Sequence, residues 1–281
     1  MIFNLTQHEP TPDQLAAGVA PRPKQVTEIV KDLLTFDEMP TPEKIKEKAE
    51  LLVTVAKAYF ESLPDKENIK KEILVGGAPY LIPEVIEALK AEGMTPLYAI
   101  SEPSAKINPE TGVKTVVFEH KGFVEVPDPL RDKELNIDSE NKKTLNLTQF
   151  PVSKEQENDS IIDPSPEDKA RIKELLMVKN VEEINDPESL QKRAEELSTI
   201  ASKYGVDKVM VGGLPILVNY IEKALIDKNK VPVYAYSERK VVEKQIDGKT
   251  EKQAIFEHKG LVPYTSSDVT IKQTMNINME R

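Results

Sequence analysis

The hydrophobic positions of this 281-residue chain fall into short apolar runs that alternate with longer amphipathic segments. The runs at residues 2–5, 73–75 and 209–211 have the length and composition of buried strands. Residues 23–34 instead carry apolar side chains at helical spacing, which are Val26, Ile29, Val30, Leu33 and Leu34. This alternation is typical of an α/β protein, in which helices cover a mostly parallel sheet.

The same series of segments occurs twice along the chain. Blocks from the first half return in the same order in the second half, which indicates an internal duplication. The paired blocks are residues 4–7 with 146–149, Gly76-Gly77 with Gly212-Gly213, residues 96–102 with 232–238, and residues 118–122 with 256–260. We therefore expect one unit at residues 1–126, a linker at 127–143, a second unit at 144–264 and a tail at 265–281.

Each unit is predicted to have the element order β-α-α-β-α-β-β. Thr41 before Pro42, and likewise Ser165 and Asp186, each precede a proline in the pattern of a helix N-cap. Turn residues at 108–112 and 247–248 predict a hairpin between the third and fourth strands. Helical crossovers make the first three strands parallel, and the hairpin places an antiparallel strand at the edge. The prediction is two tandem Rossmann-like units that pack as a pseudo-two-fold dimer within one chain.

Composition and charge exclude several classes of protein. The chain has no cysteine, so it holds no disulfide or thiolate metal site and suits a reducing cytoplasm. No run approaches the ~18 apolar residues of a membrane helix, and the N-terminus lacks the pattern of a signal peptide. The net charge of −10 argues against wrapping of long nucleic acid. We expect a cytoplasmic protein that is a monomer acting as a pseudo-dimer, and further oligomerisation stays open. Its expected partner is a small anionic nucleotide ligand, and we expect it to bind neither long nucleic acid nor a membrane.

The repeated polar residues follow the predicted parallel strands, where ligands bind in open α/β sheets. Paired glycines let the backbone approach a ligand closely, and a helix start offers free N–H groups that suit a phosphate. The same residues could instead be caps and turns that the duplicated fold needs. The expected ligand-binding residues are Thr6, Gln7, Gly76, Gly77, Ser101 and Glu102 in the first unit and Thr148, Gln149, Gly212, Gly213, Ser237, Glu238 and Arg239 in the second.

The three histidines are the first candidates for acid–base chemistry near neutral pH. His8 follows the first Thr-Gln pair and is the candidate catalytic residue, but Phe150 stands at the corresponding place, so only one half would be active. His120 and His258 fall on the apolar face of a strand, where a packed, hydrogen-bonded histidine is at least as good an interpretation. No spacing of metal ligands is visible, so we expect neither a metal nor a cofactor.

Three stretches carry a resemblance to known proteins, namely residues 4–14, residues 76–79 and residues 118–124. Together they look like a little-characterised family of short bacterial and phage proteins that typically carry one such unit. More distantly, Asn-Leu-Thr-Gln-His followed by Thr-Pro-Asp-Gln resembles small CRISPR-associated proteins that bind or degrade cyclic oligoadenylate. That resemblance implies Rossmann-like folds that bind a ligand across a two-fold interface.

The expected function combines these observations. It is nucleotide binding at the pseudo-two-fold interface, with a cyclic oligonucleotide second messenger of phage defence as the ligand. If the protein is an enzyme, it would be a metal-independent phosphodiesterase of the ring-nuclease type. Two alternatives stay open: a non-catalytic protein-interaction module, and an enzyme acting on nucleosides or sugar nucleotides.

Overall fold

The structure is a computed structural model that describes residues 1–64, 69–107, 114–128, 130, 132–138, 140–246 and 249–274. The turns predicted at residues 108–112 and 247–248 lie outside these residues. The strands on either side of each turn are described, and they pair antiparallel as the hairpin prediction requires.

The first half forms a four-stranded sheet in the order β1-β2-β3-β4, in which the first three strands are parallel and β4 is antiparallel. This arrangement confirms the predicted mixed α/β unit with an edge hairpin. Its elements are β1 (Ile2–Leu5), α1 (Pro12–Ala16), α2 (Lys24–Leu33), α3 (Pro42–Glu61), β2 (Glu72–Val75), α4 (Ile82–Ala91), β3 (Thr95–Ile107) and β4 (Lys114–Glu125).

The second half repeats this order with two additions, the short strand β7 and the short helix α7. Its sheet has the order β10-β9-β8-β6-β7. In the first half, the place of β7 is taken by a single bridge between Ile2 and Val19. The elements are β6 (Thr144–Asn146), α5 (Lys154–Asn158), β7 (Ile161–Ile162), α6 (Pro166–Leu176), α7 (Val181–Ile184), α8 (Pro187–Ser202), β8 (Lys208–Met210), α9 (Pro215–Asp227), β9 (Val231–Ile246) and β10 (Lys249–Pro263).

The helices begin where the sequence places their caps. Thr41 Oγ1 accepts a hydrogen bond from the Lys44 N–H at 3.3 Å, at the start of α3. Ser165 and Asp186 cap α6 and α8 in the same way. Each cap satisfies one of the N–H groups that a helix start leaves without an intrahelical partner.

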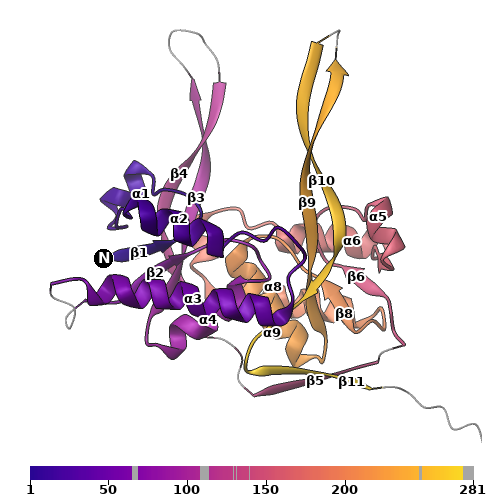
Figure 1. Cartoon of the computed structure of the whole chain (residues 1–281). Coiled ribbons are helices and arrows are strands. Elements are labelled where there is room, and N and C mark those ends of the chain that lie inside the picture. The colour runs from indigo at the N-terminus through magenta and orange to yellow at the C-terminus, as the bar shows by residue number, and fades with distance from the viewer. Residues whose placement is uncertain are drawn as a thin grey trace, which may run out of the picture.

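The linker and the tail each contain a strand, and these two strands pair with each other. β5 (Lys133–Asp138) and β11 (Val269–Thr274) form a parallel two-stranded sheet beneath the two halves (Figure 1). Leu135 and Ile137 of β5 are buried and join the main core. The segment between the units is therefore a packed part of the molecule.

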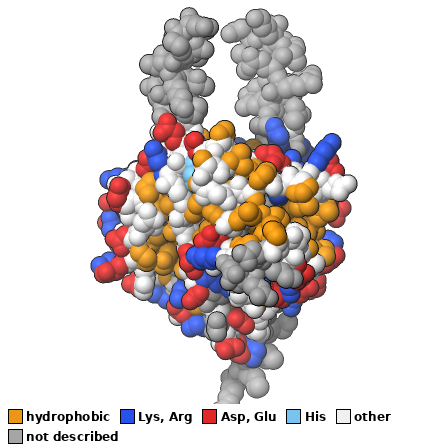
Figure 2. All heavy atoms as spheres, turned by 90° about the vertical axis from the view of Figure 1, so that its left-hand side faces the viewer, with side chains coloured by type: hydrophobic (Ala, Val, Ile, Leu, Met, Phe, Trp, Pro, Cys, Tyr) orange, Lys and Arg blue, Asp and Glu red, His pale blue; other side chains and the backbone are white. Residues whose placement is uncertain are grey.

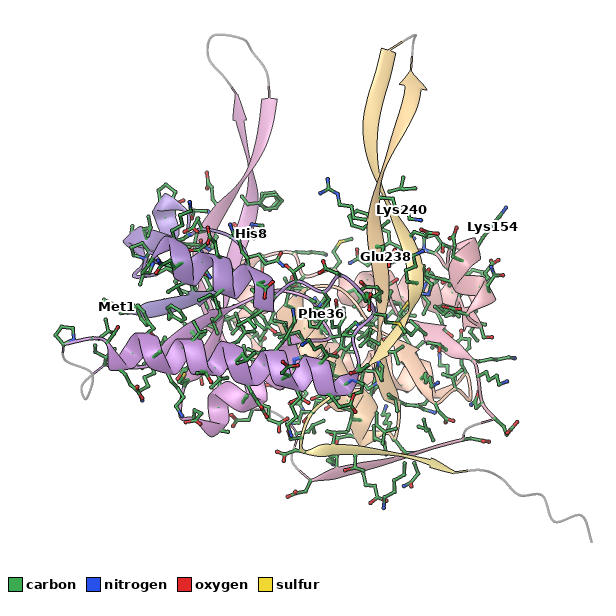
Figure 3. The ribbon with its side chains drawn as sticks, in the orientation of Figure 1. Met1, His8, Phe36, Lys154, Glu238 and Lys240 are labelled. Atoms are coloured by element: carbon green, nitrogen blue, oxygen red, sulfur yellow. The ribbon has the colours of Figure 1, made fainter. Side chains whose placement is uncertain are left out.

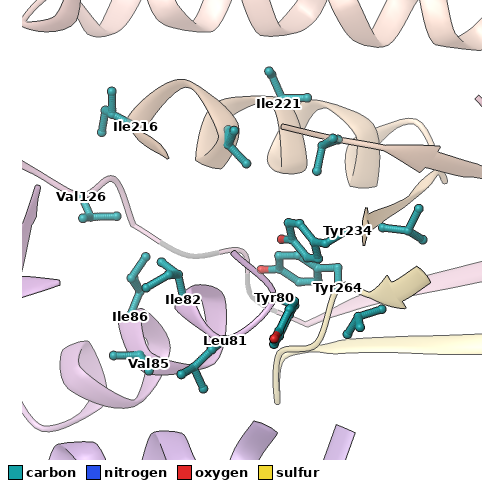
Figure 4. Close-up of a cluster of buried hydrophobic side chains, with 14 of the residues drawn as sticks. Tyr80, Leu81, Ile82, Val85, Ile86, Val126, Ile216, Ile221, Tyr234 and Tyr264 are labelled. Atoms are coloured by element: carbon teal, nitrogen blue, oxygen red, sulfur yellow. The ribbon is translucent and has the colours of Figure 1, made fainter. Parts of the chain in front are cut away.

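One hydrophobic core runs through both halves. Figure 4 shows part of this core, to which α4 and α9 both contribute isoleucines. Those side chains, Ile82, Ile86, Ile216 and Ile221, are all buried. Because burying one such side chain contributes about 1.5–3 kcal/mol, this core is a large part of what stabilises the fold.

The third strand of each half is longer than its polar motif suggested. The prediction that these strands end at Ser101-Glu102 and Ser237-Glu238 is wrong, because β3 continues to Ile107 and β9 to Ile246. With β4 and β10 they form two long hairpin arms that project from the body in the same direction (Figure 1). At the base of each arm, Lys121 or Lys259 is an extra residue that interrupts the strand register as a β-bulge, which bends and twists a ribbon.

The molecular surface mixes both signs of charge. On the face shown in Figure 2, Lys and Arg side chains are interspersed with Asp and Glu side chains. In the described part of the chain, no helix has both the length and the apolar character needed to cross a bilayer.

Candidate functional site

A cleft of about 740 Å³, here the first cleft, opens at the junction of the halves beyond the carboxyl ends of β1 and β2. Its lining from the first half includes the predicted residues Thr6, Gln7, His8, Gly76, Gly77 and Ser101. The second half contributes Ile184, residues 211–216, Val218, Asn219, Glu222 and Tyr234. The first cleft is thus built by both copies of the repeat.

A cleft of about 670 Å³, here the second cleft, lies beyond β6 and β8. It is lined by the predicted residues Thr148, Gln149, Gly212 and Gly213, and by Ser101 and Glu102 from the first half. The two clefts have a common wall, formed by Ser101, Ile184 and residues 211–214. A ligand that extends past this wall would contact both clefts.

The remaining predicted residues, Ser237, Glu238 and Arg239, line neither cleft. They lie on β9 at the base of the second arm, where Figure 3 shows Glu238. Glu238 forms an ion pair at 3.6 Å with the bulge residue Lys259, and Arg239 is exposed. The prediction that these three residues lie at a strand end is wrong, because β9 continues beyond them to Ile246.

The repeated asparagine shapes the loop that follows the first strand of each half. Asn4 is buried, its Nδ2 donates to the His8 carbonyl at 2.9 Å, and its Oδ1 accepts from the Thr6 N–H at 2.9 Å. Asn146 makes the same two bonds, to Phe150 and Thr148, at 2.8 and 2.9 Å. The asparagine therefore holds Thr-Gln in place rather than contacting a ligand.

A basic side chain donates hydrogen bonds to backbone carbonyls in each of these loops. Arg22 Nη1 donates to the carbonyls of Asn4 and Thr6 at 2.8 and 3.0 Å. In the second half, Lys169 Nζ donates to the Phe150 carbonyl at 2.8 Å and pairs with Asp163 at 2.8 Å. Both cations are used by the fold.

The Gly-Gly turns have a packing explanation of their own. A Cβ on Gly76 would lie 3.3 Å from Thr6 Cγ2, and a Cβ on Gly212 would lie 3.4 Å from Thr148 Cγ2. Gly77 and Gly213 have φ angles of 151° and 139°, which side chains rarely allow. The alternative stated above, that the fold itself needs these glycines, is therefore supported, and the turns also leave bare backbone along both clefts.

The strand histidines follow the packed, hydrogen-bonded interpretation only in part, because His258 has a side-chain partner whereas neither ring nitrogen of His120 makes a hydrogen bond of normal geometry to a described residue. His258 Nε2 lies 2.9 Å from Asp159 Oδ2, and the His120 ring packs on Phe123 with centroids 4.5 Å apart. Burial lowers the pKa of His120, which favours its neutral form. His8 is exposed and lines the first cleft near the base of the first arm (Figure 3).

A buried polar cluster lines the deep part of the first cleft, and sequence reasoning missed it. It consists of Tyr98, Asn219, Glu222 and Tyr234. The Tyr234 hydroxyl donates to Glu222 Oε1 at 2.6 Å, and Asn219 Nδ2 donates to Glu222 Oε2 at 3.4 Å. Glu222 is only 4% exposed, and burial raises its pKa from 4.5 to about 7.

The sequence held one clue to this polar cluster. Tyr98 and Tyr234 occupy the same position in the repeated third strand, so a shared role could have been inferred. Glu222 gave no such clue, because the position that corresponds to it in α4, counted from Gly-Gly, is Ile86.

The charges around the clefts are few. Among the described residues that line the first cleft, the carboxylates are Glu9 and Glu222, and none is Lys or Arg. Lys179 is a cation of the second cleft. Within the described part of the chain, no group of three or more His, Cys, Asp and Glu side chains could hold a metal ion.

These features define an α/β protein of two repeated units that share one core and build two adjoining clefts at their junction. The chain belongs to the family described as "Uncharacterized protein MJ1673 family", which matches residues 1–124 and again residues 142–262. The double match confirms the tandem duplication. A search of curated proteins gives no match.

Proposed function

We propose that the protein binds a nucleotide in the two adjoining clefts at the junction of its halves. The observation that carries the proposal is the common wall, since Ser101, Gly212 and Gly213 line both clefts. Clefts of several hundred Å³ with a few polar groups are typical of small-molecule sites. A site built by both halves also gives the duplication a use.

The phosphate groups of this nucleotide would lie at helix starts. α4 and α9 begin without a side-chain cap, so their first N–H groups lack an intrahelical partner. Leu214, Pro215 and Ile216, at the start of α9, line the first cleft. Such N–H groups and the helix dipole favour an anion. Thr6, Gln7 and Ser101 supply hydroxyl and amide groups for the sugar.

We also propose that each half is a Rossmann-like unit. Three parallel strands in sequential order, joined by helices, match the arrangement of one half of a Rossmann fold, whose ligands lie beyond the strand ends. In this interpretation the two halves are a pseudo-two-fold dimer. Two adjoining clefts favour a ligand made of repeated units, and a cyclic oligonucleotide is such a ligand.

Phosphodiesterase activity is the second candidate function. It is favoured by His8, an exposed imidazole that lines the first cleft, whereas Phe150 lines the second. His8→Ala should then lower the rate by about 100-fold or more, the usual contribution of a positioned acid or base, and leave binding intact. Unchanged turnover in His8→Ala would remove His8 from the mechanism.

Isothermal titration against cyclic di-, tri- and tetranucleotides, mononucleotides and nucleosides tests the proposal. The key variant is Ser101→Tyr, which should fill the common wall and abolish binding. Ser237→Tyr is its matched control, because Ser237 is also exposed and occupies the repeated position but lines neither cleft. Absence of heat with every ligand, or equal loss in both variants, would contradict the proposal.

A further inference from the structure

The buried polar cluster offers hydrogen-bond acceptors that the protein itself does not fill. Each carboxylate oxygen has two lone-pair sites, and the two described partners of Glu222, which are Tyr234 and Asn219, occupy one site on each oxygen. Asn219 Oδ1 is a further buried acceptor to which no described residue donates a hydrogen bond of normal geometry, although the Tyr98 hydroxyl interacts with the Asn219 side chain. A buried acceptor left unpaired is costly, so this cluster favours a ligand with donors.

No cation pairs with Glu222 among the described residues, although Lys223 and Lys228 line a smaller cavity that Glu222 also borders. Within the described residues, its neighbours in the cluster are the neutral side chains of Tyr98, Asn219 and Tyr234, and no Lys or Arg lines the first cleft. A buried carboxylate without a cation is unfavourable. Hydrogen-bond donors of a bound molecule would stabilise the Glu222 carboxylate, because the protein provides no cation for it in the first cleft.

Asn219 and Glu222 are also accessible from a second side. They lie one turn apart on α9 and line both the first cleft and a smaller cavity of about 350 Å³ beside Tyr264. The counterparts of these two residues on α4 are Pro83 and Ile86, so the first half has no equivalent cluster. This polar pair is therefore an addition to the repeated fold and is not required by it.

We infer that the buried polar cluster of the first cleft recognises a planar pair of adjacent N–H donors on the ligand. Such a pair binds a carboxylate through two parallel hydrogen bonds. Two kinds of molecule carry it: a guanine base, through its ring N–H and amino group, and a guanidinium compound. The guanine form of this inference rests on the proposed nucleotide function, and the guanidinium form does not.

Other nucleobases would fit this cluster less well. The Watson–Crick edge of adenine sets a ring acceptor beside its amino group, and that acceptor would face the carboxylate. Hypoxanthine keeps the ring N–H but lacks the amino group. The ordering guanine, then hypoxanthine, then adenine is therefore the specificity that follows from the acceptors.

The test is isothermal titration of the full chain with guanosine, inosine, adenosine and agmatine at pH 8. Glu222→Gln replaces one acceptor by an N–H donor while keeping the shape and an acceptor for Tyr234. Its matched control is Glu84→Gln, because Glu84 is also a buried helix carboxyl with a pKa raised to about 7 but lines neither cleft. Circular dichroism of both variants confirms that they are folded.

We expect guanosine to bind at least about 10-fold more tightly than inosine, and Glu222→Gln to weaken guanosine by at least about 10-fold. Glu84→Gln should leave the affinity unchanged. Agmatine binding that depends on Glu222, without nucleoside binding, would support the acceptor cluster and exclude the guanine form of the inference. Nucleoside binding that is indifferent to Glu222→Gln, or absence of binding by all four compounds, would overturn this inference alone. The proposed nucleotide function is decided separately, by the titration with cyclic nucleotides and mononucleotides.

Discussion

Replacing Glu222 by Gln should stabilise the protein, and the gain should depend on pH. The pKa of Glu222 is raised by burial from 4.5 to about 7, so the folded protein keeps a proton that the unfolded chain has already lost between these values. The contribution of Glu222 to the free energy of unfolding is therefore fully present below about pH 4.5, and it is lost as the pH rises through about 7. The amide introduced by Glu222→Gln does not titrate, so the free energy of unfolding of this variant should not show the loss that ionisation of Glu222 causes in the wild type as the pH rises.

The magnitude follows from the size of the pKa rise. At 1.36 kcal/mol per pKa unit, a rise from 4.5 to about 7 corresponds to about 3 kcal/mol. The titratable groups that face Glu222 are Tyr98, Tyr234 and Tyr264, whose pKa values are all raised, so they stay neutral in this range. The free energy of unfolding of Glu222→Gln should exceed that of the wild type by up to about 3 kcal/mol at pH 8.

Urea denaturation at pH 5 and pH 8 measures the effect. The difference between Glu222→Gln and wild type should be small at pH 5 and large at pH 8. Glu84→Gln should show the same direction, because burial also raises the pKa of Glu84 to about 7. Equal destabilisation of Glu222→Gln at both pH values would instead mean that the fold stabilises the Glu222 carboxylate, which contradicts a pKa raised by burial.

The remaining predictions concern the loops and the charge of the clefts. Asn4→Ala should cost about 2 kcal/mol in urea denaturation, because two buried hydrogen bonds of Asn4 are lost, and an unchanged midpoint would contradict the loop-shaping role. Gly77→Ala should cost about 1–3 kcal/mol, because its φ is 151° and its Cβ would lie 3.0 Å from Leu34 Cδ2; a neutral effect would show that the turn can relax. Nucleotide affinity should depend only weakly on NaCl between about 50 and 500 mM, because among the described lining residues the first cleft has no Lys or Arg and the second has Lys179 alone; a steep salt dependence in titrations would place the ligand elsewhere.

Much of the fold could be predicted because its determinants are local. Thr41, Ser165 and Asp186 mark helix starts, because each side chain accepts a hydrogen bond from the backbone N–H three residues later. The repeat then determined the element order in both halves at once. The pairing of β5 with β11 had no such determinant, because it joins segments more than a hundred residues apart.

The candidate site was predicted only in part, for physical reasons that differ by residue. Thr6 and Gly76 line a cleft as expected because the carboxyl ends of parallel strands meet at one edge of a sheet. Arg239 does not, since a hairpin arm pairs with itself and needs no sheet neighbour to continue. Glu222 was missed because its burial depends on which face of α9 meets the other half, and a glutamate at helical spacing looks like a solvated one.

The common wall implies that both halves bind one ligand together. Titration of ¹⁵N-labelled protein with the best ligand of the nucleotide panel, followed by amide NMR shifts, tests it most directly. If one ligand contacts both halves, the N–H signals of Gly76, Gly77, Gly212 and Gly213 should shift together along one saturation curve. A ligand that shifts the signals of only one Gly-Gly turn, or only those of the hairpin arms, would contradict it.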